Sequence, residues 1–167
     1  MTSRTIGRLC FLLVLAGAAA ILVVSAPDLT SLLSLHLGLN GLALDFFTHD
    51  LYRRIMLVLV IGLPFLLFVA IAILPRLTPR LTKIPNSSYW LSPERRAESL
   101  AYLERQGVVL GAIVISFLCA FHWLLVDANF AVPGRLVRAP FAVLLVFLLA
   151  ALLVWTLSIK RRFRRVA

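Results

Sequence analysis

Four long apolar runs constrain this chain more than any other feature of its sequence. They cover residues 9–26, 55–74, 108–126 and 141–159, and none of them contains Lys, Arg, Asp or Glu. Each run has about the 20 residues that a helix needs to cross the hydrocarbon core of a bilayer. A chain of 167 residues that is 62% hydrophobic could not hide four such runs in a soluble core. The sequence therefore predicts an all-α membrane protein, a single domain of four transmembrane helices.

The basic residues are distributed unevenly between the loops. Of the 17 Lys and Arg, 13 lie before the first run, between the second and third runs (75–107), or in the tail (160–167). The positive-inside rule therefore predicts cytoplasmic termini and a cytoplasmic 75–107 loop, in a multi-pass protein of the bacterial cytoplasmic (inner) membrane. This orientation explains the net charge of +10, so nucleic acid is not an expected partner. The expected partner is the bilayer with its anionic inner leaflet, bound by the lipid-anchoring tail residues Lys160, Arg161, Arg162, Arg164 and Arg165.

The external loop, residues 27–52, alternates apolar and polar residues on both sides of Asn40-Gly41. Asn-Gly is the strongest short signal for a hairpin turn, because both residues accept positive φ. We therefore predict a small external β-hairpin between the first and second helices, with an amphipathic helix as the alternative. The expected cross-strand pairs are Leu39–Leu42, Leu37–Leu44 and Leu35–Phe46. After the hairpin, Thr48 is expected to cap the second helix, with Asp50 in its first turn.

Polar residues that could form a site gather on the predicted external side. This candidate external polar site comprises His36, Asp45, His49, Asp50 and His122. Histidine and carboxylate groups can bind a metal or sense protons. The alternative is that polar residues simply collect where a loop meets water, and the chain has no tight ligand spacing such as His-x-x-x-His. We therefore assign no metal ligand.

The cytoplasmic loop contains a second patterned segment. Ser92 is a good helix cap and Pro93 suits the first helical position, so we expect a short interfacial helix over 93–106 before the third transmembrane helix. The candidate partner-binding residues of this segment are Asn86, Tyr89, Trp90, Pro93, Glu94, Arg95 and Arg96. The alternative is a solvated, charged helix that only connects two membrane helices.

Two features of the apolar runs bear on helix packing. Pro64 removes a backbone donor in the middle of the second run, which predicts a kink there. Ala16, Gly17 and Ala20 form a small-residue patch in the first run that would let another helix approach closely.

Both patterned loops resemble a known family. The external pattern is Pro27, then residues 36–41 (HLGLNG), then residues 46–52 (FFTHDLY); the cytoplasmic pattern is IPNxxYWLxPERR over 84–96, followed by Glu98. The first resembles the bacterial membrane domain of unknown function shared with the immunity protein against a sporulation-delaying toxin, and the second resembles a branch of short, uncharacterised proteins that carry this domain. The resemblance implies a multi-pass membrane protein and brings no established catalytic residue.

The sequence favours a non-enzymatic membrane protein with a regulatory, immunity-like or envelope-accessory role, which acts by binding a lipid, a membrane-protein partner or a second copy of itself. It has no nucleophile–base pattern, phosphate loop or zinc-ligand spacing, so we expect neither an enzyme nor a cofactor. A small transporter or channel component, with a water path near Pro64 and His122, is the first alternative. An external metal or pH sensor is the second.

Overall fold

Four long helices make up most of the computed structural model, which describes residues 3–25, 32–34, 46–78, 84–131 and 138–164. The first is α1 (Ser3–Ser25), the third is α6 (Arg96–Ala131) and the fourth is α7 (Arg138–Arg164). The second is continuous through α2 (His49–Leu57), η1 (Val58–Gly62), α3 (Leu63–Phe68), η2 (Val69–Ile73) and α4 (Leu74–Leu77). All four are long and apolar enough to cross a membrane, which confirms the four predicted helices and fits a multi-pass membrane protein.

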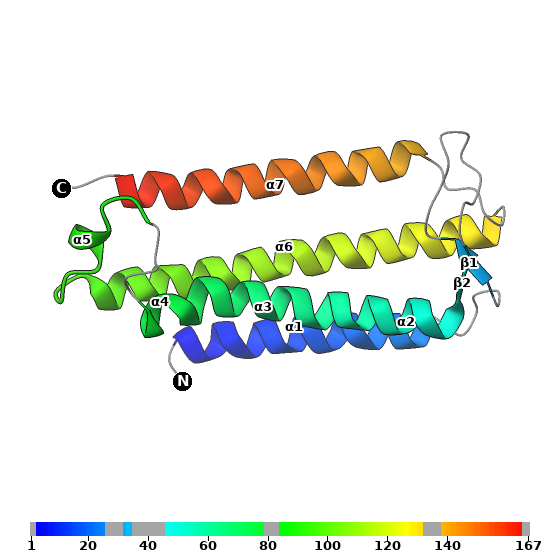
Figure 1. The fold of residues 1–167 in the computed structure, drawn as a ribbon, viewed down its shortest axis with the longest axis horizontal. Helices are drawn as coiled ribbons and strands as arrows, with labels where there is room; N and C mark the ends of the chain where they lie inside the picture. The colour runs from blue at the N-terminus through cyan, green and yellow to red at the C-terminus, as the bar shows by residue number, and fades with distance from the viewer. Residues whose placement is uncertain (1–2, 26–31, 35–45, 79–83, 132–137, 165–167) are drawn as a thin grey trace.

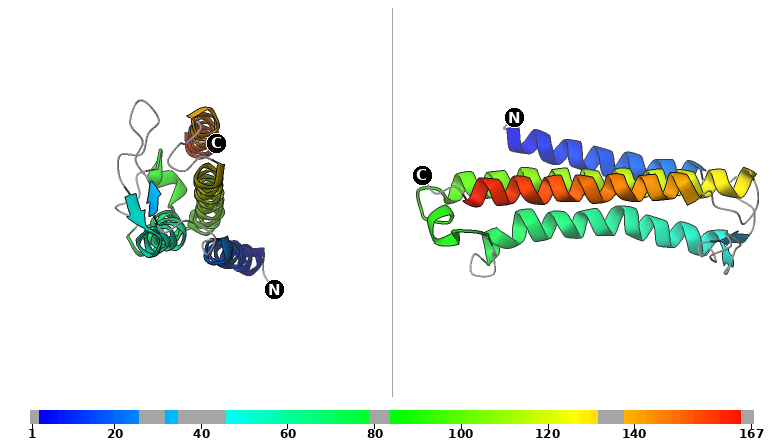
Figure 2. Two further views of the ribbon diagram at one scale, coloured as in Figure 1. Left: turned by 90° about the vertical axis from the view of Figure 1, so that its right-hand side faces the viewer. Right: turned by 90° about the horizontal axis from the view of Figure 1, so that it is seen from above.

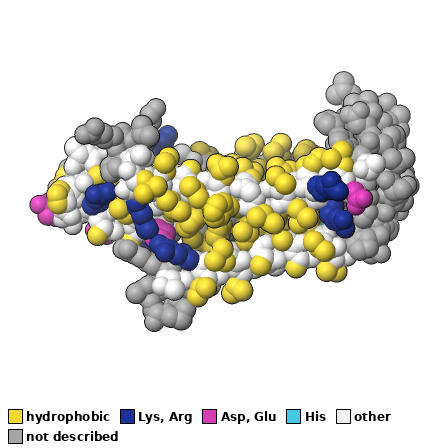
Figure 3. All heavy atoms as spheres, turned by 60° about the horizontal axis from the view of Figure 1, so that its bottom comes forward, with side chains coloured by type: hydrophobic (Ala, Val, Ile, Leu, Met, Phe, Trp, Pro, Cys, Tyr) yellow, Lys and Arg dark blue, Asp and Glu magenta, His cyan; other side chains and the backbone are white. Residues whose placement is uncertain are grey.

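Helix α6 lies at the centre of the arrangement. Helix α1 and the second long helix pack on one side of α6, and α7 lies on the other (Figures 1 and 2). The beginnings of α1 and α6 and the ends of α4 and α7 meet at one end of the bundle, which we call the basic end (Figure 1). On the face drawn in Figure 3, a band of hydrophobic side chains separates groups of Lys and Arg near the two ends. This pattern suits a bundle with an apolar middle and polar ends.

The main core forms where α1, α2, η1 and α6 meet. Its buried residues are Phe11, Leu15, Ala18, Leu22, Tyr52, Met56, Val60, Ile115, Leu118, Leu125 and Val126. Along α1 and along the second long helix they recur at intervals of three and four, as the 3.6-residue turn requires for one buried face. Helix α7 contributes none of these buried residues, so it packs against α6 as an outer helix.

Two glycines of α6 allow the neighbouring helices to approach closely. A Cβ at Gly111 would lie 2.4 Å from Phe11 Cε2 of α1, and one at Gly107 would lie 3.3 Å from Phe68 Cδ2 of α3. The rings of Phe11 and Phe68 stack with centroids 5.2 Å apart. The small-residue patch predicted on the first helix is not used in this packing: Ala16, Gly17 and Ala20 are exposed, and no described residue of another helix lies within 4 Å of a Cβ built on Gly17.

Both prolines of the second long helix follow a wider helical turn. The π-helical segment η1 ends two residues before Pro64, and η2 ends two residues before Pro75. A proline ring crowds the carbonyl four residues earlier, and a π-turn moves that carbonyl away from its α-helical position. The second helix therefore stays continuous through Pro64. At this position the sequence predicts a kink, and the structure has a wider π-helical turn before the proline.

The predicted external β-hairpin between the first and second helices is wrong, so the fold class is corrected at this point. The described residues hold only a short antiparallel ladder of β1 (Leu32–Ser34) and β2 (Phe46–Thr48), with Ser34 opposite Phe46 instead of Leu35. A one-residue change of register reverses the faces of a strand, so the predicted apolar face does not hold. Residues 35–45, with the Asn40-Gly41 turn, lie outside the described residues. The cap at Thr48 is confirmed, since its hydroxyl accepts from the Leu51 N–H at 3.4 Å.

The separate interfacial helix predicted over 93–106 is also wrong. Helix α6 runs without a break from Arg96 to Ala131, and a short helix α5 (Ser87–Trp90) precedes it. Residues 92–95 form a turn in which the N–H groups of Arg95 and Arg96 donate to the Ser92 carbonyl. Pro93 therefore lies in a turn before the helix instead of in its first turn, and the charged residues from Arg96 onward extend the third membrane helix.

Candidate functional site

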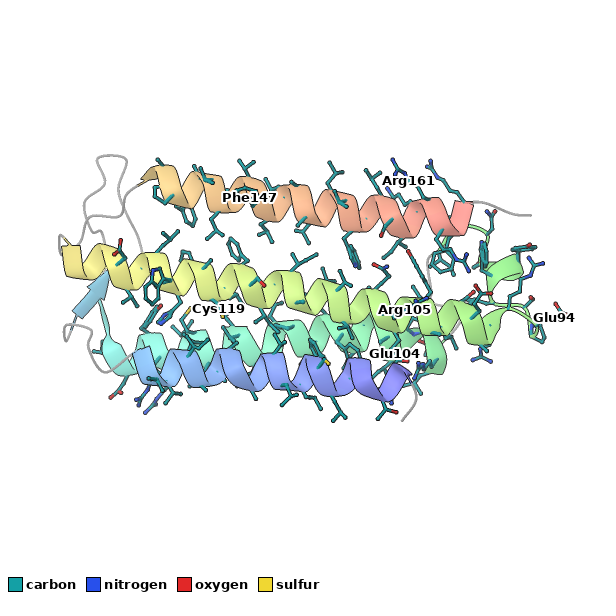
Figure 4. The ribbon with its side chains drawn as sticks, turned by 180° about the vertical axis from the view of Figure 1, so that it is seen from behind. Glu94, Glu104, Arg105, Cys119, Phe147 and Arg161 are labelled. Atoms are coloured by element: carbon teal, nitrogen blue, oxygen red, sulfur yellow. The ribbon has the colours of Figure 1, made fainter. Side chains whose placement is uncertain are left out.

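A buried carboxylate joins three helices at the basic end. Glu104 of α6 has a side chain only 5% exposed, and its two oxygens accept from Arg8 of α1, at 2.5 Å, and from Arg76 of α4. Figure 4 shows Glu104 on the side of α6 that faces α1. Each oxygen has a guanidinium partner, which compensates for the cost of removing the charge from water. Glu104 is thus a structural clamp between three separate parts of the chain.

The 84–96 segment caps the C-terminal end of α7. Trp90 Nε1 donates to the Phe163 carbonyl at 3.0 Å, and Asn86 Nδ2 donates to the carbonyls of Phe163 and Arg164 at 3.1 and 3.4 Å. These carbonyls belong to the last turn of a helix, where no intrahelical donor is available. Asn86 itself has a left-handed backbone with φ of 54°, a conformation that asparagine tolerates well. The segment therefore replaces the missing donors of α7.

An aromatic cluster fixes this cap to the bundle. Phe163 is fully buried against Trp90 and Tyr102, and both ring pairs meet edge to face at 5.7 Å. The Arg162 guanidinium lies 5.0 Å from the Trp90 ring and also pairs with Glu98 of α6. Aromatic edges, a stacked guanidinium and an ion pair thus connect α5, α6 and α7.

The cap leaves an exposed turn at the tip of the basic end. Ser99 Oγ donates to the Trp90 carbonyl at 2.8 Å, and the Arg95 guanidinium lies 3.9 Å above the Tyr89 ring, so both sides of the turn are held. Pro93 and Glu94 between them are exposed. Figure 4 shows Glu94 beyond the end of the helices.

The residues of the predicted partner segment thus have three kinds of position. Tyr89 and Arg95 are half-buried and contact each other at the base of the turn. Asn86 and Trp90 bind α7 and Trp90 is buried, so these two residues serve the fold. Pro93, Glu94 and Arg96 remain exposed at the surface. Arg96 also donates to the Arg76 carbonyl at 3.2 Å, which links the turn to the end of α4.

An apolar groove runs between α6 and α7. It consists of two overlapping hollows of 590 and 460 Å³ that share Val109, Ile113, Phe147 and Ala151. At the basic end of the groove, Trp155 Nε1 donates to the Gln106 carbonyl at 3.0 Å and Tyr102 OH donates to the Ser158 carbonyl at 3.3 Å. These bonds join the two helices at one end of the groove.

The structure brings together only part of the candidate external polar site. His122 is 1% exposed and shares a 2.6 Å hydrogen bond with the hydroxyl of Tyr52, which is equally buried. Asp50 is exposed and pairs with Arg53 at 3.3 Å. His36 and Asp45 lie outside the described residues, as does the side chain of His49. Among the described residues, no group of three or more His, Cys, Asp or Glu could hold a metal ion.

The basic tail is divided between packing and exposure. Arg162 is engaged with Glu98 and Trp90, whereas Lys160, Arg161 and Arg164 are exposed. Arg165 lies outside the described residues. The exposed cations remain candidates for contact with an anionic leaflet.

Sequence reasoning missed the residues that hold the basic end and the centre of the bundle together. Glu104 looked like one charge of a solvated helix, although a carboxylate next to an apolar run is a reasonable candidate for a buried pair. Gly107 and Gly111 form a Gly-x-x-x-Gly spacing, which is an established signal of close helix packing in membranes. The sequence contains both signals, the carboxylate and the glycine spacing. The residues that pack against them belong to other helices and lie far away in the sequence.

Comparison with known protein families, curated proteins and solved structures returned no match to this chain.

Proposed function

We propose that this chain is a non-enzymatic, multi-pass protein of the bacterial cytoplasmic membrane, with both termini in the cytoplasm. In this proposal it has a regulatory, immunity-like or envelope-accessory role and binds a partner protein through the turn at residues 92–96. The turn would present Pro93 and Glu94 to the aqueous phase beyond the helix ends.

The charge of the two bundle ends supports this orientation. Helix ends that meet at the basic end carry Arg8, Arg76, Arg105, Lys160, Arg161, Arg162 and Arg164, and the turn before α6 adds Arg95. At the opposite end, the first two turns of α2 carry Arg53 and Arg54, with Asp50 beside them. Lys and Arg in excess on one side favour the cytoplasm for that side.

The observation that carries the proposal is an exposed turn held rigidly from both sides. Before it, Asn86 and Trp90 bond to α7; after it, Arg96 bonds to the end of α4. The bonds of Asn86 and Trp90 serve the fold by capping α7, and they also order the turn in advance, from which a binding loop gains affinity. The polar tip then suits a polar protein surface, with Glu94 as its charged contact.

Site-specific photo-crosslinking in intact membranes tests the proposal. With the crosslinking residue at position 93, we expect an adduct with a different protein, lost when Glu94→Lys reverses the adjacent charge. The matched control carries Asp50→Lys, which makes the same change at the opposite end and should keep the adduct. Adducts with lipid or with the same chain alone, or equal loss in both variants, would contradict the proposal.

The orientation has its own test. Reporter domains fused after residue 165 and inserted at residue 40 should report opposite sides of the membrane, with the tail on the cytoplasmic side. If the tail is external, the proposed role of the turn fails with it.

A further inference from the structure

The groove between α6 and α7 is suited to an extended apolar chain. Its lining runs from Gln106 to Ala120 on α6, which is about 21 Å at a rise of about 1.5 Å per residue. One leaflet supplies half of a hydrocarbon core of about 30 Å, so the groove is long enough for a lipid chain that enters from one side. Its shared lining is Val109, Ile113, Phe147 and Ala151, all apolar.

Next to the groove lining, each of the two helices carries an arginine at the basic end: Arg105 precedes Gln106 on α6, and Arg161 follows Ser158 on α7. On α7, Phe147, Val154 and Arg161 recur every seven residues and therefore share a face. The same holds on α6. Val109 lies four residues after Arg105, and Ala112 lies three residues after Val109, so the three side chains share a face. Figure 4 shows Arg105 and Arg161 at the same end of the bundle, on the two helices that form the groove.

These two arginines are available for a ligand. Both are exposed, and neither forms an ion pair with another described residue, unlike Arg162, whose charge is matched by Glu98. Arg105 is placed beside the groove by Tyr102, whose ring centroid is 6.0 Å from the guanidinium and whose hydroxyl bonds to the Ser158 carbonyl in the groove lining. Within the part of the chain that the structure describes, no carboxylate pairs with these two positive charges near the mouth of the groove.

We propose that this groove is a binding site for one anionic phospholipid. An acyl chain lies along Val109, Ile113 and Ala151, and the phosphate lies at the mouth, between Arg105 and Arg161. Basic pockets between membrane helices bind anionic headgroups, and guanidinium–phosphate hydrogen bonds are charge-assisted and strong. The site is separate from the turn at 92–96 and needs no partner protein.

The positive charge at the mouth of the groove favours a lipid as its occupant, in preference to a second copy of the chain. Copies in one membrane share an orientation, so a second copy in the groove would bring its own Arg105 and Arg161 to the same depth. Like charges brought close together at the same depth repel one another. A phospholipid instead supplies the opposite charge together with the apolar chain.

Trp155 lines the groove and serves as a reporter, because brominated acyl chains quench indole fluorescence on contact. The test uses the purified full chain carrying Trp123→Phe, which removes an indole that is 65% exposed, in phosphatidylcholine vesicles. Of the two indoles that stay, Trp90 is buried and Trp155 lines the groove. A small fraction of brominated phosphatidylglycerol should quench Trp155 more than the same fraction of brominated phosphatidylcholine. The variant Arg105→Gln/Arg161→Gln should lower this preference by at least about fivefold.

Two controls separate a site from a general surface charge. Lys160→Gln/Arg164→Gln removes the same charge from the same turns of α7, at positions outside the seven-residue repeat of Phe147, Val154 and Arg161, and should keep the preference. Ala112→Leu narrows the groove and should reduce quenching by either lipid. Equal losses in the two charge variants, or no preference in the parent chain, would overturn the proposal. So would a crosslink between Phe147 positions of two copies accompanied by loss of quenching. The vesicle assay contains no partner protein, so its outcomes do not depend on the proposed binding of a partner at residues 92–96.

Discussion

The Phe11 ring occupies the space where a side chain at position 111 would lie. A Cβ added to Gly111 would approach Phe11 Cε2 to 2.4 Å and Cζ to 3.1 Å, and Phe11 is itself buried and stacked on Phe68. This contact joins α1, α3 and α6 at the end of the core that is nearest the basic end. The absence of a side chain at one position thus sets how closely three helices pack.

We expect Gly111→Ala to destabilise the protein by about 1–3 kcal/mol, because the ring must leave its site and overpacking has this cost. Gly107→Ala is the matched control: its nearest contact would be 3.3 Å from the flexible edge of Phe68, and alanine favours a helix by about 1 kcal/mol over glycine. Unfolding in mixed micelles, followed by circular dichroism, measures both. Combining Gly111→Ala with Phe11→Leu should recover part of the loss, and equal effects of the two glycine variants would refute the argument.

Glu104→Gln should weaken the basic end more than the removal of any exposed charge. It leaves Arg8 and Arg76 without their shared carboxylate, and the cost should be about 1–3 kcal/mol, since both arginines keep some contact with water. In a double-mutant cycle, Arg76→Gln should cost less in the Glu104→Gln background than in the parent chain. Additive losses would show that the two side chains do not interact. Glu94→Gln, at an exposed position, is the control.

The four helices could be predicted from the sequence because their cause is local. An uncharged run of about 20 residues must satisfy its own backbone in lipid, and a helix does so wherever the run lies in the fold. The cap at Thr48 was predictable for the same reason, since the hydroxyl and its donor are three residues apart.

The clamp, the glycine contacts and the α7 cap could not be predicted because their partners are distant in the chain. Glu104 pairs with a residue 96 positions away, and Trp90 bonds to a carbonyl 73 positions away. The hairpin failed differently: a local turn signal at Asn40-Gly41 set the expected register, whereas the observed ladder borders the start of α2 and pairs Ser34 with Phe46. The observed pairing is one residue away from the register that this turn signal predicts, and a shift of one residue exchanges the two faces of a strand.

Trp90→Phe should loosen the end of α7 while keeping an aromatic ring at this position. The variant lacks the donor to the Phe163 carbonyl and has a smaller ring at a buried position, so the expected loss is at least about 1 kcal/mol. Hydrogen exchange should become faster in the last turns of α7 and stay unchanged in its first half. Trp123→Phe, at an exposed position, should change stability by less than about 0.5 kcal/mol. Unchanged exchange at the end of α7 would mean that Asn86 alone is sufficient for the cap.

Tyr52→Phe should be costly although it removes a single oxygen atom. The hydroxyl is bonded to His122 Nδ1 at 2.6 Å between two rings that are each 1% exposed, so its loss leaves a buried polar nitrogen without this partner, at about 1–3 kcal/mol. Because the cost arises from the imidazole left behind, His122→Phe should make Tyr52→Phe much less damaging, and the coupling energy in mixed micelles measures this directly. Tyr102→Phe, whose 3.3 Å bond is only partly buried, should have a smaller effect. Strictly additive losses at positions 52 and 122 would show that the two side chains stabilise α2 and α6 independently.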